Sequence, residues 1–218
     1  MVLNRIPQQV RLIALHLTTL FPLAWLVWDV LTGNLSLNPY ENLIRRTGQA
    51  AVLALIFTLS CTPLSRWLNR PFILFFRKPF GLYTFFYALL HLSIFFIMGY
   101  EGNLVMTTRE ILARTNLTLG LVAFLILLIL AATSNRATQE MLKKNWKNIQ
   151  RLIYPAALLI GSHYLMARKA PTPASLLAAA MIAGLLLVRL AGSTRSKNNP
   201  LHPNAQNLSQ DQKPAPGN

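Results

Sequence analysis

The chain has 218 residues, of which 53% are hydrophobic and 12% are charged, and its formal charge is +15. Soluble domains carry about 25% charged residues, so this composition excludes an ordinary soluble domain and predicts an integral membrane protein. The basic residues lie in short segments between apolar runs, so we interpret them as topology signals and not as a nucleic-acid-binding surface. The single cysteine, Cys61, excludes an intrachain disulfide, a four-thiolate iron–sulfur cluster and a thioether-linked c-type haem.

Six mostly apolar runs are long enough to be membrane-spanning helices, which need roughly 17–25 residues. No small-residue cleavage site follows the first run, so we predict a retained span there and not a signal peptide. The predicted fold is therefore an all-α integral membrane protein, built as a six-helix transmembrane bundle. The predicted spans are residues 12–31, 48–64, 79–99, 115–133, 151–167 and 173–191.

The chain divides into residues 1–192, predicted to form one transmembrane domain, and residues 193–218, predicted to be a disordered polar tail. The tail contains His202, which we expect to be solvated. Most of the 21 Lys and Arg residues fall in the N-terminus, in the second and fourth loops and after the last span. The positive-inside rule then predicts that both termini are cytoplasmic.

Two histidines lie deep inside predicted spans, His91 in FFYALLHLSIFF and His163 in AALLIGSHYLMA. An ionisable side chain at membrane depth is costly, and by default it marks a functional site. Each histidine lies about 12 residues, or roughly 18 Å, past the inner start of its span. Both therefore lie just beyond the middle of a hydrocarbon core about 30 Å thick. Equal depth on two parallel helices is what two axial imidazole ligands of one haem require.

The paired histidines also allow interpretations without haem. A membrane histidine often forms only a hydrogen bond to a neighbouring helix. Zinc fits less well, because structural zinc sites need four ligands and catalytic sites usually have three. A proton relay would bring Asp or Glu into the core, and no acid lies mid-span. His16, near the cytoplasmic end of the first span, either contacts a cofactor or only forms a hydrogen bond at the interface.

The predicted span around His91 is rich in aromatic residues. Tyr87 and Phe95 lie one turn on either side of His91 and are the better candidates for contact with a porphyrin, whereas ordinary helix packing explains most of the remaining aromatic residues. In the span of His163, Gly161 and Ser162 are small enough to let a flat ring approach.

Several stretches resemble, in order and spacing, the MsrQ (YedZ) family, the haem-binding membrane subunits of the bacterial periplasmic methionine sulfoxide reductase system. That family belongs to the ferric reductase-like transmembrane superfamily, which includes the NADPH oxidases. The matching stretches are LHLTTLFPLAWLVWDV (15–30), RTGQAAVLAL (46–55), TPLSRW (62–67), RKPFGLYTFFYALLHL (77–92), LTLGLVAFLILLILAATS (117–134) and NWKNIQRLIYPAALLIGSHYL (145–165).

The resemblance implies a multi-pass protein of the bacterial inner (cytoplasmic) membrane that binds haem b and transfers electrons, with His91 and His163 as the axial ligands. It implies quinone-pool quinol or a cytoplasmic flavin reductase as the electron donor and FMN as a further candidate cofactor. The implied acceptor is a periplasmic molybdopterin methionine sulfoxide reductase, MsrP, which repairs oxidised periplasmic proteins. Four basic residues of the predicted outer loops either steer this acceptor, hold haem propionates or are only solvated. They are Arg109, Arg114, Arg168 and Lys169.

The chain departs from the family pattern at Gln150, where the family usually has a histidine. Amides are poor iron ligands, so the second, inner site that the family implies, formed by Gln150 and the neighbourhood of Arg77, lacks its obvious ligand. We predict one haem at His91 and His163 and leave a second haem as an alternative. Arg77 also has a simpler interpretation as a positive-inside anchor or a partner for phosphate or propionate.

Two further functions stay open from the sequence. The chain has no Gly-rich dinucleotide fingerprint, so nicotinamide chemistry would occur on another protein and we do not expect this chain to carry substrate chemistry alone. A stand-alone ferric or cupric reductase is one alternative. A small transporter with structural histidines is the second, but the spans contain few polar residues and no inverted repeat is obvious.

Overall fold

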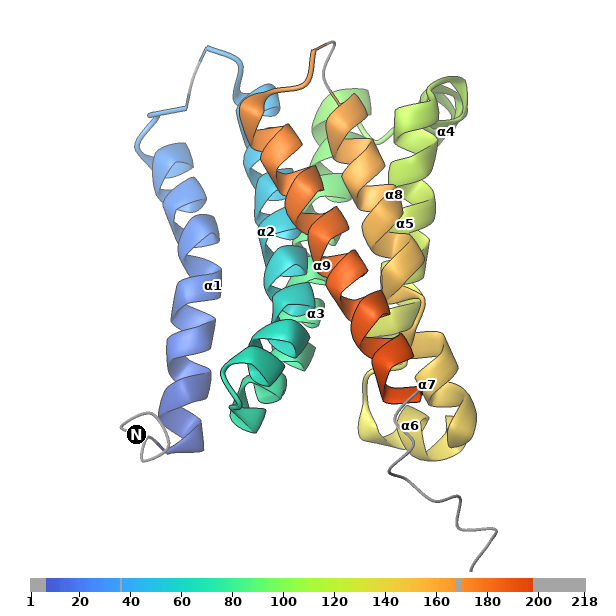
Figure 1. Ribbon diagram of the computed structural model, residues 1–218. Helices are drawn as coiled ribbons and strands as arrows, with labels where there is room; N and C mark the ends of the chain where they lie inside the picture. Colours follow the sequence, from blue (N-terminus) through green and yellow to red (C-terminus); the bar gives the residue numbers. More distant parts are fainter. Residues whose placement is uncertain (1–6, 36, 168–169, 198–218) are drawn as a thin grey trace, which may run out of the picture.

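The computed structural model describes residues 7–35, 37–167 and 170–197. Throughout these ranges the regular structure is helical, with no strand, and the long helices run side by side (Figure 1). The long helices are α1 (Gln8–Leu31), α2 (Pro39–Trp67), α3 (Arg77–Ile94), α5 (Thr115–Ala132), α8 (Ile153–Met166) and α9 (Pro173–Lys197). The shorter ones are the 3₁₀ helix η2 (Pro71–Phe76), the π-helical η3 (Phe95–Gly99), α4 (Leu104–Ala113), α6 (Arg136–Leu142) and α7 (Lys144–Gln150).

Four stretches of the described chain are long and apolar enough to cross a membrane, and they contain the first four predicted spans or most of each. Helix α8 has 14 residues, about 21 Å at 1.5 Å per residue, and the apolar part of α9 is also shorter. Both nevertheless pack in the same bundle. The all-α, multi-pass membrane fold is therefore confirmed, whereas the count of six spans stays a prediction. The four stretches are Gln9–Leu31, Pro39–Trp67, Pro71–Gly99 and Thr115–Ala132.

Helix α1 begins and α9 ends at the lower end of the bundle in Figure 1. These two helix ends therefore lie at one end of the bundle, whereas the cytoplasmic location of the two termini stays a prediction. Helix α9 runs to Lys197, so residues 193–197 of the predicted tail are helical. Residues 198–218, with His202, lie outside the described residues.

Asparagine side chains begin three of the helices, as their N-cap preference predicts. The side chain of Asn38 accepts a hydrogen bond from the Glu41 N–H at the start of α2, where Pro39 occupies the first helical position. The side chains of Asn103 and Asn135 cap α4 and α6 in the same way. These caps explain why the chain re-enters a helix after each of the corresponding loops.

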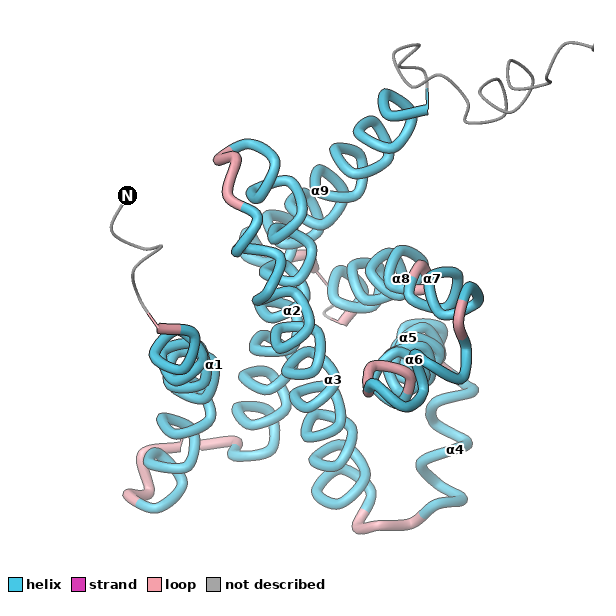
Figure 2. Tube along the Cα trace, turned by 90° about the horizontal axis from the view of Figure 1, so that it is seen from below, coloured by secondary structure: helices cyan, strands magenta, loops and turns pink. Residues whose placement is uncertain are grey.

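The core is formed where α2, α5, α8 and α9 meet. Helix α2 packs most closely on α3, and α5 packs most closely on α8. In lipid, apolar burial gives little driving force, and close contact between small residues matters more. Ala156 and Ala157 of α8 are fully buried, which brings that helix close to its neighbours. Figure 2, seen from below, separates the α2–α3 pair from the α5–α8 pair. Further core residues are Leu55, Leu59, Leu127 and Ile182.

A buried arginine joins α9 to α2. Pro63 lies inside α2 and has no N–H to donate to the carbonyl of Leu59. The Nε–H of Arg189, from α9, donates to that carbonyl at 3.1 Å, and its Nη2 donates to the Thr58 carbonyl and the Thr62 hydroxyl, each at 3.0 Å. The guanidinium thus replaces the hydrogen bond that the proline removes.

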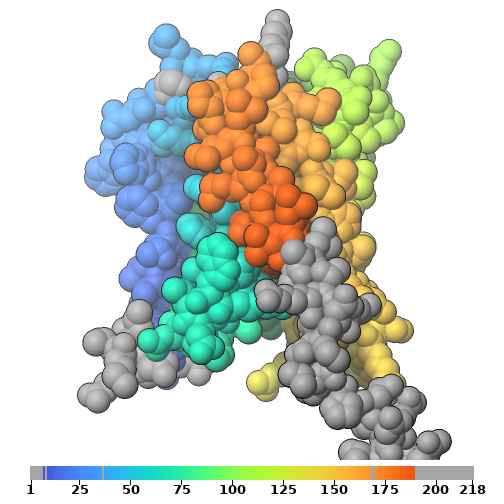
Figure 3. All heavy atoms as spheres, in the orientation of Figure 1, coloured from blue at the N-terminus to red at the C-terminus, as the bar shows by residue number. Residues whose placement is uncertain are grey.

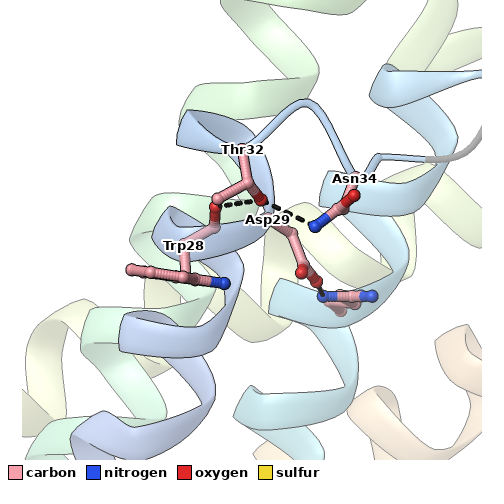
Figure 4. Close-up of polar contacts among 5 residues, drawn as sticks. Trp28, Asp29, Thr32 and Asn34 are labelled. Atoms are coloured by element: carbon pink, nitrogen blue, oxygen red, sulfur yellow. Dashed lines mark hydrogen bonds and ion pairs between the residues drawn. The ribbon is translucent and has the colours of Figure 1, made fainter.

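Helix α1 stands apart from the remaining long helices in Figures 1 and 2. Near its upper end, Asp29 accepts a hydrogen bond from Arg46 of α2 at 2.5 Å. The loop that follows is ordered by Thr32, whose hydroxyl donates to the Trp28 carbonyl and accepts from the Asn34 amide, each at 2.8 Å (Figure 4). These contacts fix the upper end of α1 against α2. In the space-filling view, α9 (orange to red) packs across the front of the bundle above the teal segment (Figure 3).

Candidate functional site

The two histidines that the sequence places at matching depth meet inside the bundle. His91 lies on α3 and His163 on α8, and both side chains are half-buried. Their ring centroids are 6.3 Å apart, and their planes are nearly perpendicular, at 84°. Two residues 72 positions apart in the chain (163 − 91) therefore form one pair.

Each imidazole is oriented by a backbone carbonyl of a neighbouring helix. The Nδ1–H of His91 donates to the Ile44 carbonyl of α2 at 2.9 Å, and the Nδ1–H of His163 donates to the Asn116 carbonyl of α5 at 2.7 Å. A carbonyl only accepts hydrogen bonds, so Nδ1 carries the proton in each ring. The Nε2 lone pair is then available, which is the form in which a neutral imidazole binds a metal.

A glycine lies against each imidazole on the helix that supplies the carbonyl. A Cβ atom at Gly48 would lie 3.1 Å from Nδ1 of His91, and one at Gly120 would lie 2.9 Å from Nδ1 of His163. Both distances are shorter than ordinary van der Waals contact, which begins at 3.4 Å. Any larger residue at these positions would therefore push the ring away from its carbonyl.

The two halves of the site repeat along the chain. Three pairs of equivalent residues are each separated by 72 positions: the carbonyl-bearing residues Ile44 and Asn116, the two glycines and the two histidines (116 − 44, 120 − 48 and 163 − 91). Each histidine lies 47 residues after the residue whose carbonyl it binds. The helix pairs α2–α3 and α5–α8 thus present one imidazole each, held in the same way. Because both pairs run in the same order and direction, this is a parallel repeat and not an inverted one.

The donor set fits an axially ligated haem better than a bare metal ion. No group of three or more His, Cys, Asp or Glu side chains capable of holding a metal lies in the described part of the chain. Two metal–nitrogen bonds of about 2 Å each, plus roughly 1 Å from each nitrogen to its ring centre, give about 6 Å, which is close to the observed 6.3 Å. A porphyrin supplies the remaining four nitrogens, so two imidazoles complete its iron.

Three more of the predicted cofactor contacts have partners elsewhere. The buried Tyr87 hydroxyl donates to the Thr19 carbonyl of α1 at 2.5 Å. Phe95 begins the π-helical turn η3 and packs on Tyr100, with ring centroids 5.0 Å apart. His16 binds the Tyr83 hydroxyl. Contact of these three residues with a cofactor stays a prediction. The π-helical turn η3 begins one turn after His91, and such turns are frequent at functional sites.

The two residues of the second, inner site lie in different surroundings. Arg77 begins α3, and its side chain is half-buried. The Gln150 amide donates to the Leu130 carbonyl at 3.4 Å and to the Thr133 hydroxyl at 3.2 Å. Gln150 therefore holds the last turn of α5. Its role in a second cofactor site stays a prediction.

Sequence reasoning missed the carbonyls of Ile44 and Asn116 and the role of Gly48 and Gly120. A backbone carbonyl carries no sequence signal, because any residue supplies one. The glycines did carry a signal, since both lie 43 residues before a membrane histidine (91 − 48 and 163 − 120). The parallel repeat could have been found by aligning the chain with itself at an offset of 72 residues.

These observations define a class: a multi-pass helical membrane protein with two neighbouring, carbonyl-anchored imidazoles in its bundle. A family model described as ferric reductase like transmembrane component matches residues 47–161, more than half of the chain. The chain belongs to this family, whose members commonly bind haem and act in membrane redox or electron transfer. The matched range includes His91, Gly48 and Gly120 and ends two residues before His163. No solved structure matches the chain.

Proposed function

We propose that the protein is a haem b electron-transfer subunit of the bacterial inner membrane. In this proposal, one haem is held between His91 and His163. Electrons come from the quinone pool or from a cytoplasmic flavin donor, with FMN as a candidate second cofactor. They pass to a periplasmic molybdopterin methionine sulfoxide reductase of the MsrP type, which supports repair of oxidised periplasmic proteins.

The observation that carries this proposal is the pair of imidazoles whose centroids lie 6.3 Å apart. Both Nδ1 atoms donate to carbonyls, so both Nε2 atoms are free for a metal. Two neutral nitrogen ligands saturate a porphyrin iron and favour electron transfer over oxygen binding. The chain's own contribution is to hold the rings, through Ile44 and Asn116, and to leave space for them, through Gly48 and Gly120.

The direction of electron flow follows from the proposed orientation. If the lower end in Figure 1 faces the cytoplasm, Arg109 of α4 lies on the periplasmic side, together with the exposed Arg114, which pairs with Glu110. These residues would face a docked periplasmic partner. Of the predicted docking residues, Arg168 and Lys169 lie outside the described residues.

The family match also favours a second candidate, a stand-alone ferric or cupric reductase. The two candidates share the haem and differ in the acceptor. Supplied with a quinol as electron donor, the chain purified alone should reduce a ferric or cupric chelate rapidly if it is a metalloreductase. It should turn over rapidly only with the molybdopterin reductase and methionine sulfoxide if our proposal holds.

The haem assignment is tested by spectroscopy of the purified full-length chain. We expect the absorption of a reduced low-spin b-type haem, and we expect His91→Ala and His163→Ala each to lose it. His202→Ala, which removes a histidine from the predicted tail, serves as the control and should retain it. Full haem occupancy with an unchanged spectrum in both of the first two variants would show that the ligand assignment is wrong.

A further inference from the structure

A histidine and a tyrosine meet at the exposed side of the contact between α1 and α3. Nδ1 of His16 lies 2.6 Å from the Tyr83 hydroxyl, and the two rings make an edge contact with centroids 5.7 Å apart. His16 is exposed and Tyr83 is half-buried. Both residues lie in stretches long and apolar enough to cross a membrane. This polar pair is therefore open to the lipid side of the bundle.

The bond between His16 and Tyr83 is not the only link between these helices. One turn higher, the Tyr87 hydroxyl donates to the Thr19 carbonyl at 2.5 Å, and Tyr87 is 2% exposed. The bond between Tyr87 and Thr19 is therefore buried, and it contributes to the packing of α1 on α3. The outer pair differs from this buried link, because the side chain of His16 is exposed and that of Tyr83 is only half-buried.

The pair offers one donor and one acceptor whichever tautomer is present. If the Tyr83 hydroxyl donates to Nδ1, the Nε2–H of His16 is a free donor and the tyrosine oxygen is a free acceptor. If Nδ1–H donates instead, Nε2 becomes the acceptor and the tyrosine O–H becomes the donor. A ring hydroxyl both donates and accepts, so it can form two hydrogen bonds with this pair.

The surroundings indicate a neutral, lipid-soluble ligand. The acids of the described chain lie in loops, in short helices or at helix ends and not mid-span, so a cationic ligand would find no counter-charge at the pair. Apolar side chains flank the pair on both helices. Phe86 makes an edge contact with Tyr83, with centroids 6.4 Å apart, and Leu17 and Leu20 are exposed on α1.

We propose that His16 and Tyr83 bind the ring hydroxyl of a quinol that enters from the lipid between α1 and α3. This inference rests on the proposed electron-transfer function, for which it supplies the donor site. Tyr83 precedes His91 by eight residues on the same helix (91 − 83), about 12 Å along its axis. A quinol at this position would shorten the path that an electron travels from the inner surface to the histidine pair.

The test uses the full-length chain in lipid nanodiscs under anaerobic conditions, with short-chain ubiquinol and menaquinol analogues as probes. Binding is followed by quenching of tryptophan fluorescence, because Trp25 and Trp28 lie on α1. His16→Ala and Tyr83→Phe should each raise the Kd about tenfold, the loss expected for one hydrogen bond. Tyr87→Phe is the matched control, since it breaks the second α1–α3 link and leaves the pair intact, and it should change the Kd by less than about twofold.

Unchanged binding in His16→Ala and Tyr83→Phe would overturn the proposal, and so would an equal loss in Tyr87→Phe, which would show that only helix packing matters. Haem content is measured in the same samples, so the two proposals fail separately. Quinol binding that depends on the pair in a chain without haem would sustain this site and refute the relay. A chain with normal haem but no quinol binding would sustain the relay and refute this site.

Discussion

Replacing Gly120 by alanine should loosen the cofactor without unfolding the helix. The new Cβ would lie 2.9 Å from Nδ1 and Cε1 of His163, whereas ordinary contact begins at 3.4 Å, so the ring must move by about 0.5 Å (3.4 − 2.9). That movement acts on a 2.7 Å hydrogen bond to the Asn116 carbonyl. Functional groups need placement within about 0.5 Å, and changes to groups that orient metal ligands typically cost 10–100-fold in affinity. We expect haem affinity to fall by that factor.

The assay is haem retention by the purified variant during dilution or transfer to a haem acceptor, measured beside its thermal stability. In a helix, Gly→Ala by itself favours folding by up to about 1 kcal/mol, so a general loss of stability is not expected. Gly184→Ala in α9 is the matched control, because a Cβ there meets nothing within 4 Å. If Gly120→Ala holds haem as tightly as Gly184→Ala does, the contact between this glycine and His163 has no role in the site.

Three further predictions concern side chains around the site and the core. Asn116→Ala should leave the haem spectrum unchanged, because the imidazole is held by the backbone carbonyl and not by the side chain; a shifted spectrum would contradict this. In a double-mutant cycle of thermal unfolding, Arg189→Leu should cost about 1 kcal/mol less when Pro63 is also alanine, since the restored N–H can bond the Leu59 carbonyl; additive effects would refute the coupling. Gln150→Ala should lower stability by about 0.5–1 kcal/mol, through the lost bonds to α5, with haem content unchanged; loss of haem would instead place Gln150 at a cofactor.

The membrane-helical class and the histidine pair could be predicted from the sequence. Apolar run length predicts where a helix can cross a bilayer, and polar residues are so rare in such runs that His91 and His163 stand out. The expected equal depth rested on predicted starts at residues 79 and 151, whereas α3 begins at Arg77 and α8 at Ile153. The two errors have opposite signs, so they add: His91 lies 14 residues after the start of α3 (91 − 77) and His163 lies 10 after the start of α8 (163 − 153). The histidines therefore meet because of how the helices pack, and not because they lie equally far from the helix starts.

The short helices and the contacts that orient the site could not be predicted. Helices α4, α6 and α7 lie at the ends of the bundle, where hydropathy carries little information. Asparagine caps begin α4 and α6, and α7 begins at Lys144 without a side-chain cap. The hydrogen bonds of Tyr87 and His16 to partners about 67 residues away depend on the angle at which α1 packs against α3. Composition and periodicity do not encode that angle, because it results from packing between whole helices.

The central claim is that one porphyrin iron lies between the imidazoles of His91 and His163. Electron paramagnetic resonance of the oxidised, purified chain tests this claim most directly. With ring planes at 84°, we predict a low-spin ferric signal with the strongly anisotropic g values of near-perpendicular bis-imidazole ligation, in one copy per chain. A high-spin ferric signal from the wild-type chain, or a low-spin signal that persists in His163→Ala, would contradict the account.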